Sequence, residues 1–429
     1  MVKNFQKMNI LILGSGGREH ALTWKLAQSK KIDKIFIGPG NAGTSLSGTN
    51  LNLNTENFNE IKAAVLENKI DIVIVGPEAP LTMGIHDFFL NDPSLEKIPI
   101  IGPDKSAARL EGSKDFAKGF LTRHDIPTAS YKTFDSTTVN EVSEFLRSLT
   151  PPYVIKADGL AAGKGVVIVD DVSEAEKEVI AMLNGKFGAA GQKVVIEQFL
   201  KGIELSVFII TDGYSYKILP EAKDYKRVGV GDTGLNTGGM GAVSPVPFAD
   251  QNFMKKVKDR IIDPTMRGLS ADGIRYTGFI FFGLINVEGN PYVIEYNARL
   301  GDPESEVIIP RIKSDLFELI EGVANGDLSE REIEIDERFV TTVMLVSGGY
   351  PGKFEKGKPV HGLDLTDRSV LFHAGTRNEG DKVVTSGGRV IAVSSWGHTM
   401  KDALKESYRN AKLLNFDGSY YRSDIGFDL

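Results

Sequence analysis

The chain has 429 residues, with 46 glycines, no cysteine and a formal net charge of -7. Its length suggests about three domains, and its hydrophobic share of 41% is typical of a folded globular protein. The lack of cysteine excludes a disulfide framework, a thiolate metal site and a cysteine nucleophile. The acidic balance disfavours a nucleic-acid binder, and no apolar run is long enough to cross a membrane. With no secretory pattern at the start, we expect a cytoplasmic α/β protein that binds neither nucleic acid nor membrane.

Strand and helix patterns alternate over the first 109 residues. Helical spacing predicts a helix that begins at Arg18 and another over 55–68. Apolar runs predict strands at 9–13, 34–37, 71–75 and 98–101. Buried strands that alternate with helices indicate a doubly wound parallel sheet, in which ligands bind at the carboxyl ends of the strands. We therefore predict an N-terminal substrate-binding α/β domain over 1–109.

The middle of the chain mixes strands, glycine loops and helices. One helix is predicted at 104–124 and another at 315–324, with Ser314 as its cap. Strands are predicted at 153–156, 166–169, 194–199, 278–286 and 292–294. These elements make up a predicted central domain over 110–327, with a smaller lid subdomain over about 128–200.

The last hundred residues change to short strands. A charged stretch at 328–338 is predicted to be a linker. A final helix is predicted at 400–415, after strands at 341–346, 370–372 and 389–393. The predicted third domain, 328–429, is therefore a small β-rich α+β domain.

The glycine-rich loop at 14–17 follows a strand and opens a helix. Free N–H groups and the dipole at a helix N-terminus attract an anion, so this loop predicts a phosphate site. A dinucleotide fingerprint would have glycine where Glu19 stands, and an acidic residue about 20 positions on. A nicotinamide dehydrogenase and a plain tight turn are the alternatives. The neighbouring His20 is expected to pack at the helix start or anchor a loop, and not to act as a catalyst.

A second loop of small residues, at 157–165, lies between two predicted strands. Its N–H groups suit the oxygens of a triphosphate, and Lys156 on the preceding strand adds a positive charge. The order of residues is not that of a Walker A loop, and a bare hairpin is the alternative. Residues 159–165 of this loop, and residues 231–241, are candidates for closing over bound ligands.

Acidic residues accompany the strand at 194–199 and the chain just after it. The end of this strand can expose backbone groups to adenine, and the carboxylate of Glu204 can accept from the hydroxyls of a ribose. Glu197 and Glu204 are equally explained as solvated surface charges. The pattern alone does not decide between these interpretations.

Polar residues gather at the end of the strand at 292–294. Glu295 and Asn297 are two positions apart, so they face the same side of the strand. Two oxygen ligands on one face suit Mg²⁺ that bridges phosphates. Arg299 and residues 301–304 extend this cluster, for which a solvated strand face is the alternative.

Taken in order, these motifs resemble those of the ATP-grasp superfamily and, within it, of the phosphoribosylamine–glycine ligase family. The resemblance implies an ATP-dependent carboxylate–amine ligase that joins glycine to 5-phosphoribosylamine through glycyl phosphate, the second step of purine biosynthesis. It also implies ATP and Mg²⁺ or Mn²⁺ as cofactors. The matching segments are 16–21, 39–44, 76–81, 110–114, 156–165, 236–241, 295–304, 372–376 and 387–390.

The resemblance also implies roles for the matching residues. Glu295 and Asn297 are expected to hold the metal, and Arg299, Lys156 and Asp302 to be catalytic. Residues 14–17 are expected to take the substrate phosphate, Glu78 the ribose hydroxyls, and Arg299 the carboxyl group of glycine. ATP is expected to contact Lys114, Lys156, Gly163, Gly165, Glu197, Phe199, Leu200 and Glu204. The substrates are expected at Gly16, Gly17, Arg18, Asn41, Ala42, Gly43, Thr44, Glu78, Asp224, Lys226 and Arg299.

Some features leave alternatives open. Many ATP-grasp enzymes carry a second carboxylate on the strand before the metal ligands, but residues 278–286 contain no acid. We therefore expect two protein ligands, with phosphate and water completing the shell. Asp224 and Lys226 are equally explained as part of a charged exposed turn. The alternative functions are another ATP-grasp carboxylate–amine ligase or carboxylase of purine metabolism, and a non-catalytic nucleotide sensor. The chain is expected to be a monomer or a weak dimer.

Overall fold

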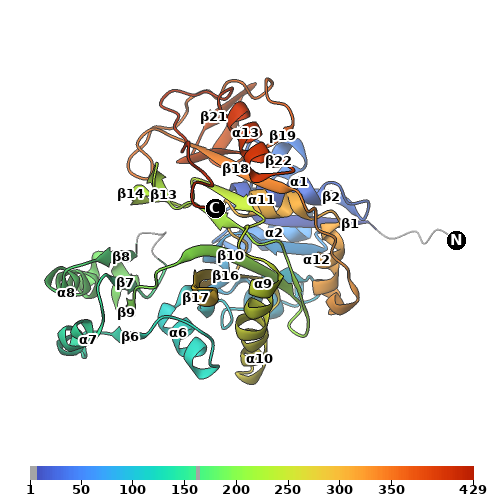
Figure 1. Ribbon diagram of the computed structural model, residues 1–429. Coiled ribbons are helices and arrows are strands. Elements are labelled where there is room, and N and C mark those ends of the chain that lie inside the picture. The colour runs from blue at the N-terminus through green and yellow to red at the C-terminus, as the bar shows by residue number, and fades with distance from the viewer. Residues whose placement is uncertain (1–6, 161–164) are drawn as a thin grey trace.

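The computed structural model describes residues 7–160 and 165–429. Its N-terminal part is a parallel sheet in the strand order β3-β2-β1-β4-β5. Apolar side chains of β1 and β4 are fully buried, because helices cover the sheet on both faces (Figure 1). The predicted doubly wound sheet is therefore confirmed. The strands are β1 (Met8–Gly14), β2 (Ile32–Pro39), β3 (Thr49–Asn50), β4 (Ile72–Val75) and β5 (Ile100–Ile101), and the helices α1 (Gly17–Leu26), α2 (Phe58–Glu67), α3 (Glu78–Met83) and α4 (Ile85–Leu90).

A second, antiparallel sheet has the order β11-β10-β16-β17 and packs against helices of the central part. The register between β16 and β17 shifts, so that Gly283 pairs with Glu295 while Leu284 pairs with Val293. Ile294 is therefore the extra residue of a β-bulge. The elements are β10 (Ile203–Thr211), β11 (Tyr216–Ile218), β16 (Gly278–Val287), β17 (Asn290–Asn297), α5 (Arg109–Gly112), α6 (Lys114–Arg123), α9 (Gln251–Val257), α10 (Asp263–Ala271), α11 (Ser305–Ile308) and α12 (Leu316–Asn325).

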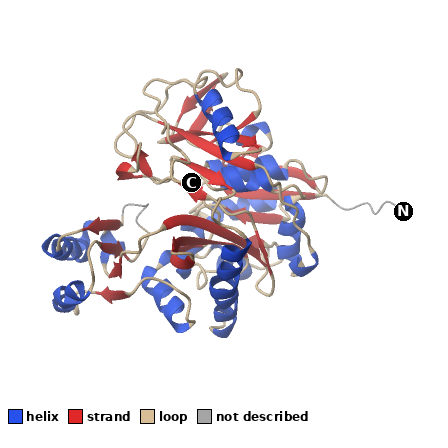
Figure 2. Ribbon diagram, viewed as in Figure 1, coloured by secondary structure: helices blue, strands red, loops and turns tan. Residues whose placement is uncertain are grey.

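A small four-stranded sheet, β6-β9-β7-β8, stands apart at the left of Figure 1. Two helices lie at its outer end (Figure 2). They pack on the sheet through a hydrophobic cluster of its own, which includes Phe134, Leu146 and Ile155. The elements are β6 (Tyr131–Phe134), α7 (Val142–Ser148), β7 (Tyr153–Ala157), β8 (Val166–Val169), α8 (Val172–Ala181) and β9 (Val194–Gln198).

A further sheet, which we call the third sheet, has the order β12-β15-β18-β22-β19, and α13 packs on it. Two of its strands, β12 and β15, come from the middle of the chain, which the division of the sequence into consecutive segments does not reveal. Between them lies the exposed hairpin β13–β14. The elements are β12 (Lys223–Asp224), β13 (Arg227–Gly229), β14 (Thr233–Asn236), β15 (Gly241–Ser244), β18 (Phe339–Val346), β19 (Ser369–His373), β20 (Thr376–Glu379), β21 (Lys382–Thr385), β22 (Arg389–Gly397) and α13 (Met400–Ala411).

The prediction of one continuous helix over 104–124 is wrong, because the structure has two helices there, α5 and α6. Ser113 has extended backbone angles and interrupts it, and its hydroxyl accepts a hydrogen bond from Phe116 N at 3.1 Å. This N-cap starts α6 anew. The cap of α12 is also not Ser314 but Asp315, whose carboxylate accepts from Phe317 N at 2.9 Å.

The predicted linker at 328–338 is partly built into the fold. Leu328 is fully buried, and Ile335 forms a β-bridge with Ile312. The final helix ends at Ala411, short of the predicted 415. Within the described ranges, no helix has the length and apolar character needed to cross a membrane.

Candidate active site

A cavity of about 570 Å³ lies where the small sheet, β17 and the 224–238 segment meet, and we call it the main cavity. Its wall includes residues from every one of these elements, and also from the starts of α1 and α3. It brings together most of the side chains that the sequence singled out: Arg18, Glu78, Lys114, Lys156, Gly165, Glu197, Asp224, Lys226, Glu295, Asn297, Arg299 and Asp302.

The oxygen ligands predicted for a metal lie on one face of β17. Glu295 and Asn297 both line the main cavity, as their spacing of two along the strand requires. A carboxylate and an amide oxygen fit Mg²⁺ or Mn²⁺, which bind few protein ligands and keep several waters. Among the described residues, no three His, Cys, Asp or Glu side chains are grouped as a metal site.

A buried ion triad supports the opposite side of the main cavity. The Glu197 carboxylate lies 2.8 Å from Lys156 Nζ and 2.8 Å from Lys118 Nζ. Burial raises the pKa of Glu197, but the two ammonium groups outweigh it and hold that pKa below its ordinary value. Burial lowers the pKa of Lys118 to about 8. Glu197 therefore holds lysines in place.

Lys156 also reaches the bulge of β17. Its Nζ donates to Ile294 O at 3.4 Å, so one ammonium group joins the small sheet to the strand of the metal ligands. Lys114, at the start of α6, donates from Nζ to Gly159 O at 3.2 Å. Burial lowers the pKa of Lys114, and both lysines face the main cavity.

Arg299 is held by two carboxylates. Its Nη2 lies 2.9 Å from Glu111 Oε1, and its Nε lies 3.5 Å from Glu78 Oε2. The other oxygen of Glu111 accepts from Ala298 N at 2.7 Å, which fixes the backbone beside the arginine. Burial raises the pKa of Glu78, but Arg299 and Arg18 outweigh it and lower that pKa.

Lys226 forms the third charged group of the main cavity. Its Nζ lies 2.9 Å from Asp224 Oδ1 and 2.9 Å from Glu204 Oε2. Desolvation lowers the pKa of Lys226, but these carboxylates and Glu295 outweigh it and hold the pKa well above its ordinary value. Lys226 is therefore charged at neutral pH.

A second cavity, of about 350 Å³, shares Asp302 and Arg389 with the main cavity. N-terminal loops supply Ser15, Gly16 and Asn41 to its wall, and loops of the third sheet supply residues 374–376 and 386–387.

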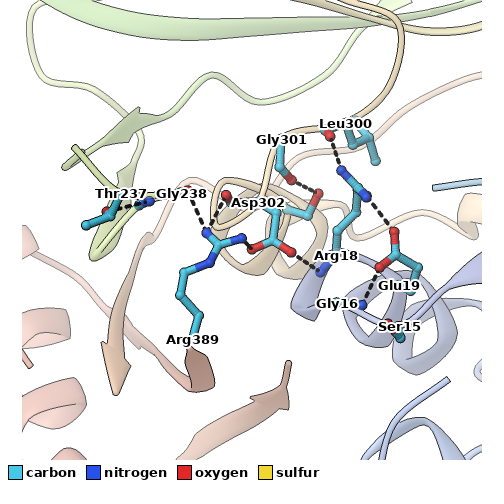
Figure 3. Close-up of polar contacts among 12 residues, drawn as sticks. Ser15, Gly16, Arg18, Glu19, Thr237, Gly238, Leu300, Gly301, Asp302 and Arg389 are labelled. Carbon is cyan, nitrogen blue, oxygen red and sulfur yellow. Dashed lines mark hydrogen bonds and ion pairs between the residues drawn. The ribbon is translucent and has the colours of Figure 1, made fainter. Parts of the chain in front are cut away.

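Arg389 and Asp302 line both cavities, and we call this pair the partition between them. Figure 3 shows the contacts of the two side chains. Arg389 Nη1 donates to Gly238 O at 2.6 Å and to Asp302 O at 2.7 Å, and Nη2 lies 2.9 Å from Asp302 Oδ1. Burial raises the pKa of Asp302, but Arg389 and Arg18 outweigh it and hold that pKa below its usual range. Asp302 is therefore an ionised carboxylate at the boundary of both cavities.

Comparison with known proteins assigns the chain. Models of the N, ATP-grasp (A) and C domains of phosphoribosylglycinamide synthetase match residues 8–111, 112–305 and 340–428. Phosphoribosylamine–glycine ligases of Vibrio cholerae and Salmonella typhimurium are 45% and 46% identical to it, over 98% of both chains in each case. The chain belongs to the phosphoribosylamine–glycine ligase family. The crystal structure of the Thermotoga maritima phosphoribosylamine–glycine ligase superimposes with a TM-score of 0.83 at 36% identity, and the alignment covers 97% of this chain and 99% of that one.

The ATP-grasp fold of the family extends to more distant proteins. The biotin carboxylase domain of the Hydrogenobacter thermophilus 2-oxoglutarate carboxylase has a TM-score of 0.73 at 15% identity, with 97% of this chain and 92% of that chain covered. A likeness at this identity shows the shared fold alone.

Carboxylates of the protein lie at the start of α1, where the sequence predicts a phosphate site. Gly16 N donates to Glu19 Oε2 at 2.5 Å, and Arg18 N donates to Asp302 Oδ2 at 3.3 Å. Gly17 lies against the buried carboxyl group of Glu306. Burial and the neighbouring charge of Asp302 raise the pKa of Glu306 well above its ordinary value. Carboxyl groups of the protein thus already occupy much of this helix N-terminus.

Some predicted residues do not line the main cavity, and Asn41 lines only the second one. Asn41 Oδ1 accepts from Gly43 N and Thr44 N at 2.8 and 3.0 Å, and Asn41 Nδ2 donates to His373 O at 2.7 Å. The loop that contains Ala42, Gly43 and Thr44 is therefore an anchor between the first and third sheets. Phe199, Leu200 and Glu204 do not line the main cavity either. Gly163 lies outside the described residues.

Sequence reasoning did not assign roles to several residues on these walls. Glu111 and Arg389 sit inside segments that carried the family resemblance, 110–114 and 387–390, which was the available signal. Lys118 is four residues after Lys114 on one face of α6, but only the fold places it beside Glu197. Glu304 lines the main cavity, and burial followed by the charge of Asp224 raises its pKa to about 7.

Proposed function

We propose that this chain uses ATP to join glycine to 5-phosphoribosylamine, giving glycinamide ribonucleotide, ADP and phosphate. The observation that carries this function is family membership along the whole chain, since its curated relatives are phosphoribosylamine–glycine ligases at 45–46% identity. The charges of the main cavity support the same chemistry. We further propose that the chain acts in the cytoplasm as a monomer or a weak dimer, and that its domains are 1–109, 110–327 with a lid at about 128–200, and 328–429.

ATP is proposed to bind between the small sheet and β17. Lys114 and Lys156 face the space where its phosphates would lie, and phosphoryl transfer depends mainly on positioning and on charge neutralisation. Glu295 and Asn297 would hold Mg²⁺ or Mn²⁺, and a metal held there would neutralise negative charge of the phosphates during transfer. Closure of residues 159–165 and 231–241 over the ligands stays a prediction, as do contacts of ATP with Phe199, Leu200, Glu204 and Gly163.

Glycine is proposed to bind beside Arg299, whose guanidinium faces the main cavity between Glu78 and Glu111. A carboxylate oxygen of glycine attacks the γ-phosphorus of ATP, and ADP leaves. The amine of 5-phosphoribosylamine then attacks the carbonyl carbon of glycyl phosphate, and phosphate leaves. The nitrogen loses a proton in this step, and Asp302 is the proposed acceptor because it is ionised and borders both cavities.

The ribose phosphate is proposed to enter by way of the second cavity. Gly16, Asn41 and Asp302 border it, so the amine could approach the main cavity past the partition. Glu78 remains the proposed partner of the ribose hydroxyls from the main-cavity side. The carboxylates at the start of α1 argue that only part of residues 14–17 is open to a phosphate.

The decisive test is ADP release with each candidate pair of substrates. We expect ADP to form only when glycine and 5-phosphoribosylamine are both present with ATP and Mg²⁺. Release that ignores glycine but requires bicarbonate would show a carboxylase instead. ATP binding without turnover on any pair would show a nucleotide sensor.

A further inference from the structure

The 223–226 segment has one face toward the main cavity and one away from it. Asp224 and Lys226 line the cavity. Lys223 and Tyr225 alternate with them and point to the other side, as extended backbone requires. There they meet one carboxylate: Asp428 Oδ2 lies 3.1 Å from Lys223 Nζ, and Asp428 Oδ1 accepts from the Tyr225 hydroxyl at 2.9 Å.

Other residues near Asp428 contact the hairpin β13–β14, which follows the 223–226 segment. The side chain of Arg422 is fully buried, pairs with Asp232 at 2.6 Å and donates to Arg227 O at 3.0 Å. Asp424 holds the arginine on its other side at 2.8 Å and accepts from Gly231 N at 2.7 Å. Charge-assisted bonds of a guanidinium are among the strongest and most directional in proteins.

A third contact joins the end of the chain to the hairpin: the hydroxyl of Tyr420 donates to Val228 O at 3.0 Å. We call residues 420–428 the clamp. In Figure 1 the end of the chain lies beside β13 and β14, above the small sheet. No residue of the clamp lines either cavity.

Apart from the clamp, the half-buried Val228 packs the hairpin on a hydrophobic core, and Gly238 N donates to the Tyr350 hydroxyl at 2.9 Å. All residues of β14 are exposed, and a two-stranded ribbon alone is marginally stable in water. Yet β14 ends at Asn236, which lines the main cavity with Thr237 and Gly238. Gly238 in turn accepts the hydrogen bond from Arg389. The position of this wall therefore depends on contacts made from outside the cavity.

We propose that the clamp positions one wall of the active site: Asp428 and Arg422 hold the 223–238 segment so that Asp224, Lys226 and residues 236–238 face the bound ligands. Asp428 and Arg422 are positioning residues, because they act through the segment and do not touch the cavity. This inference rests on the proposed function for its kinetic test and on the geometry alone for its structural test.

The structural test is hydrogen exchange of Asp428→Ala and Asp232→Ala in the full chain without ligands. We expect faster exchange of amides in 224–238, with exchange in β17 and the N-terminal sheet unchanged. Asp417→Ala is the matched control, since its carboxylate is also near the end of the chain but is exposed and pairs only with Lys358. Unchanged exchange in 224–238 for both Asp428→Ala and Asp232→Ala would overturn the proposal, whatever reaction the protein catalyses.

The kinetic test is a double-mutant cycle between Asp428 and Lys226. Because Asp428→Ala leaves the buried Lys223 without its carboxylate, we expect it to lower stability as well. After correction for the fraction unfolded, it should lower kcat about tenfold, and Tyr225→Phe should lower kcat less, because Lys223 still holds the carboxylate. In a Lys226→Ala background, Asp428→Ala should have little further effect. Equal losses in both backgrounds, or a loss that only follows the fraction unfolded, would overturn the proposal. If ADP release by the wild-type protein does not depend on glycine, the proposed function is refuted, and the exchange result still decides on the clamp.

Discussion

The main cavity has two kinds of wall. The wall made by β17 and the small sheet is held from within, since Glu197, Lys156 and Lys118 form a buried triad and Glu111 fixes Arg299. The wall made by the 224–238 segment includes the hairpin β13–β14, whose second strand is exposed, and residues 420–428 contact this segment from outside. The comparison shows one wall held by contacts between residues that line the cavity and another contacted from behind by a separate segment of the chain.

The largest expected effect concerns the wall made by β17 and the small sheet, which we call the inner wall. Glu295→Ala removes the only carboxylate that β17 presents to the main cavity, so we expect turnover to fall by about 10³-fold. Thermal stability should change little, because the side chain lies at the cavity surface. Steady-state kinetics over a range of Mg²⁺ concentrations would measure this. Full activity at saturating Mg²⁺ would contradict the metal assignment.

The next effect tests whether the inner wall is held by its ion triad. Glu197→Gln leaves two buried ammonium groups without their carboxylate, and breaking such a pair costs about 3 to 5 kcal/mol. Denaturant unfolding should show this loss. The control is Glu141→Gln, which breaks an exposed pair with Lys132 and should cost under about 1 kcal/mol. Equal effects of the two substitutions would mean that the triad does not stabilise this wall.

A third prediction concerns the joint between the walls. Arg389→Lys keeps the charge but loses the geometry that joins Gly238 O to Asp302. A shift of about 1 Å in a reacting group can cost about 100-fold, so we expect a loss of this order in kcat. Arg377→Lys, in an exposed pair with Glu379, is the control and should keep its activity. Wild-type kcat in Arg389→Lys would show that the partition has no role in turnover.

The smallest expected effect concerns the pH dependence of stability from two buried histidines, His20 and His373, which line neither cavity. His373 N donates to His20 Nδ1 at 2.8 Å, and burial lowers the pKa of His20 to about 3 and that of His373 to about 4. Because these folded-state values lie below the unfolded value, the unfolded chain takes up protons as the pH falls below about 6.5, and stability is lost. At pH 5.5 each histidine should account for about 1.4 kcal/mol of this loss.

His20→Gln tests this assignment, because glutamine can accept a hydrogen bond but does not titrate. The loss of stability between pH 7.5 and pH 5.5, measured by denaturant unfolding, should shrink by about that amount in the variant. An unchanged pH dependence would contradict a buried neutral His20. The position of His20 against Phe372 and His373 agrees with the packing and anchoring role expected from the sequence.

The sequence predicts the inner wall better than the outer one, for a physical reason. Strand periodicity alone places Glu295 and Asn297 on one face, and glycine loops after buried strands mark the ligand edge of the N-terminal sheet. Local patterns do not reveal contacts between distant residues. The pairs of Asp428 with Lys223 and of Arg389 with Asp302 join residues 205 and 87 positions apart, so only the fold shows them.

The start of α1 and the break before α6 both depend on polar contacts. A glycine loop before a helix predicts an anion, which stays a prediction at α1, and the carboxylates of Glu19 and Asp302 also contact this helix start. The break at Ser113 depends on a side-chain cap, which competes with a helical pattern that otherwise continues. Both features follow from polar contacts that periodicity does not register.

The most direct test of the proposed ligation follows the oxygen atoms of glycine. With glycine labelled by ¹⁸O in its carboxylate, the account predicts that one labelled oxygen appears in inorganic phosphate for each glycinamide ribonucleotide formed, because the carboxylate is phosphorylated before the amine attacks. Unlabelled phosphate, formed while glycine is consumed, would contradict the glycyl phosphate route.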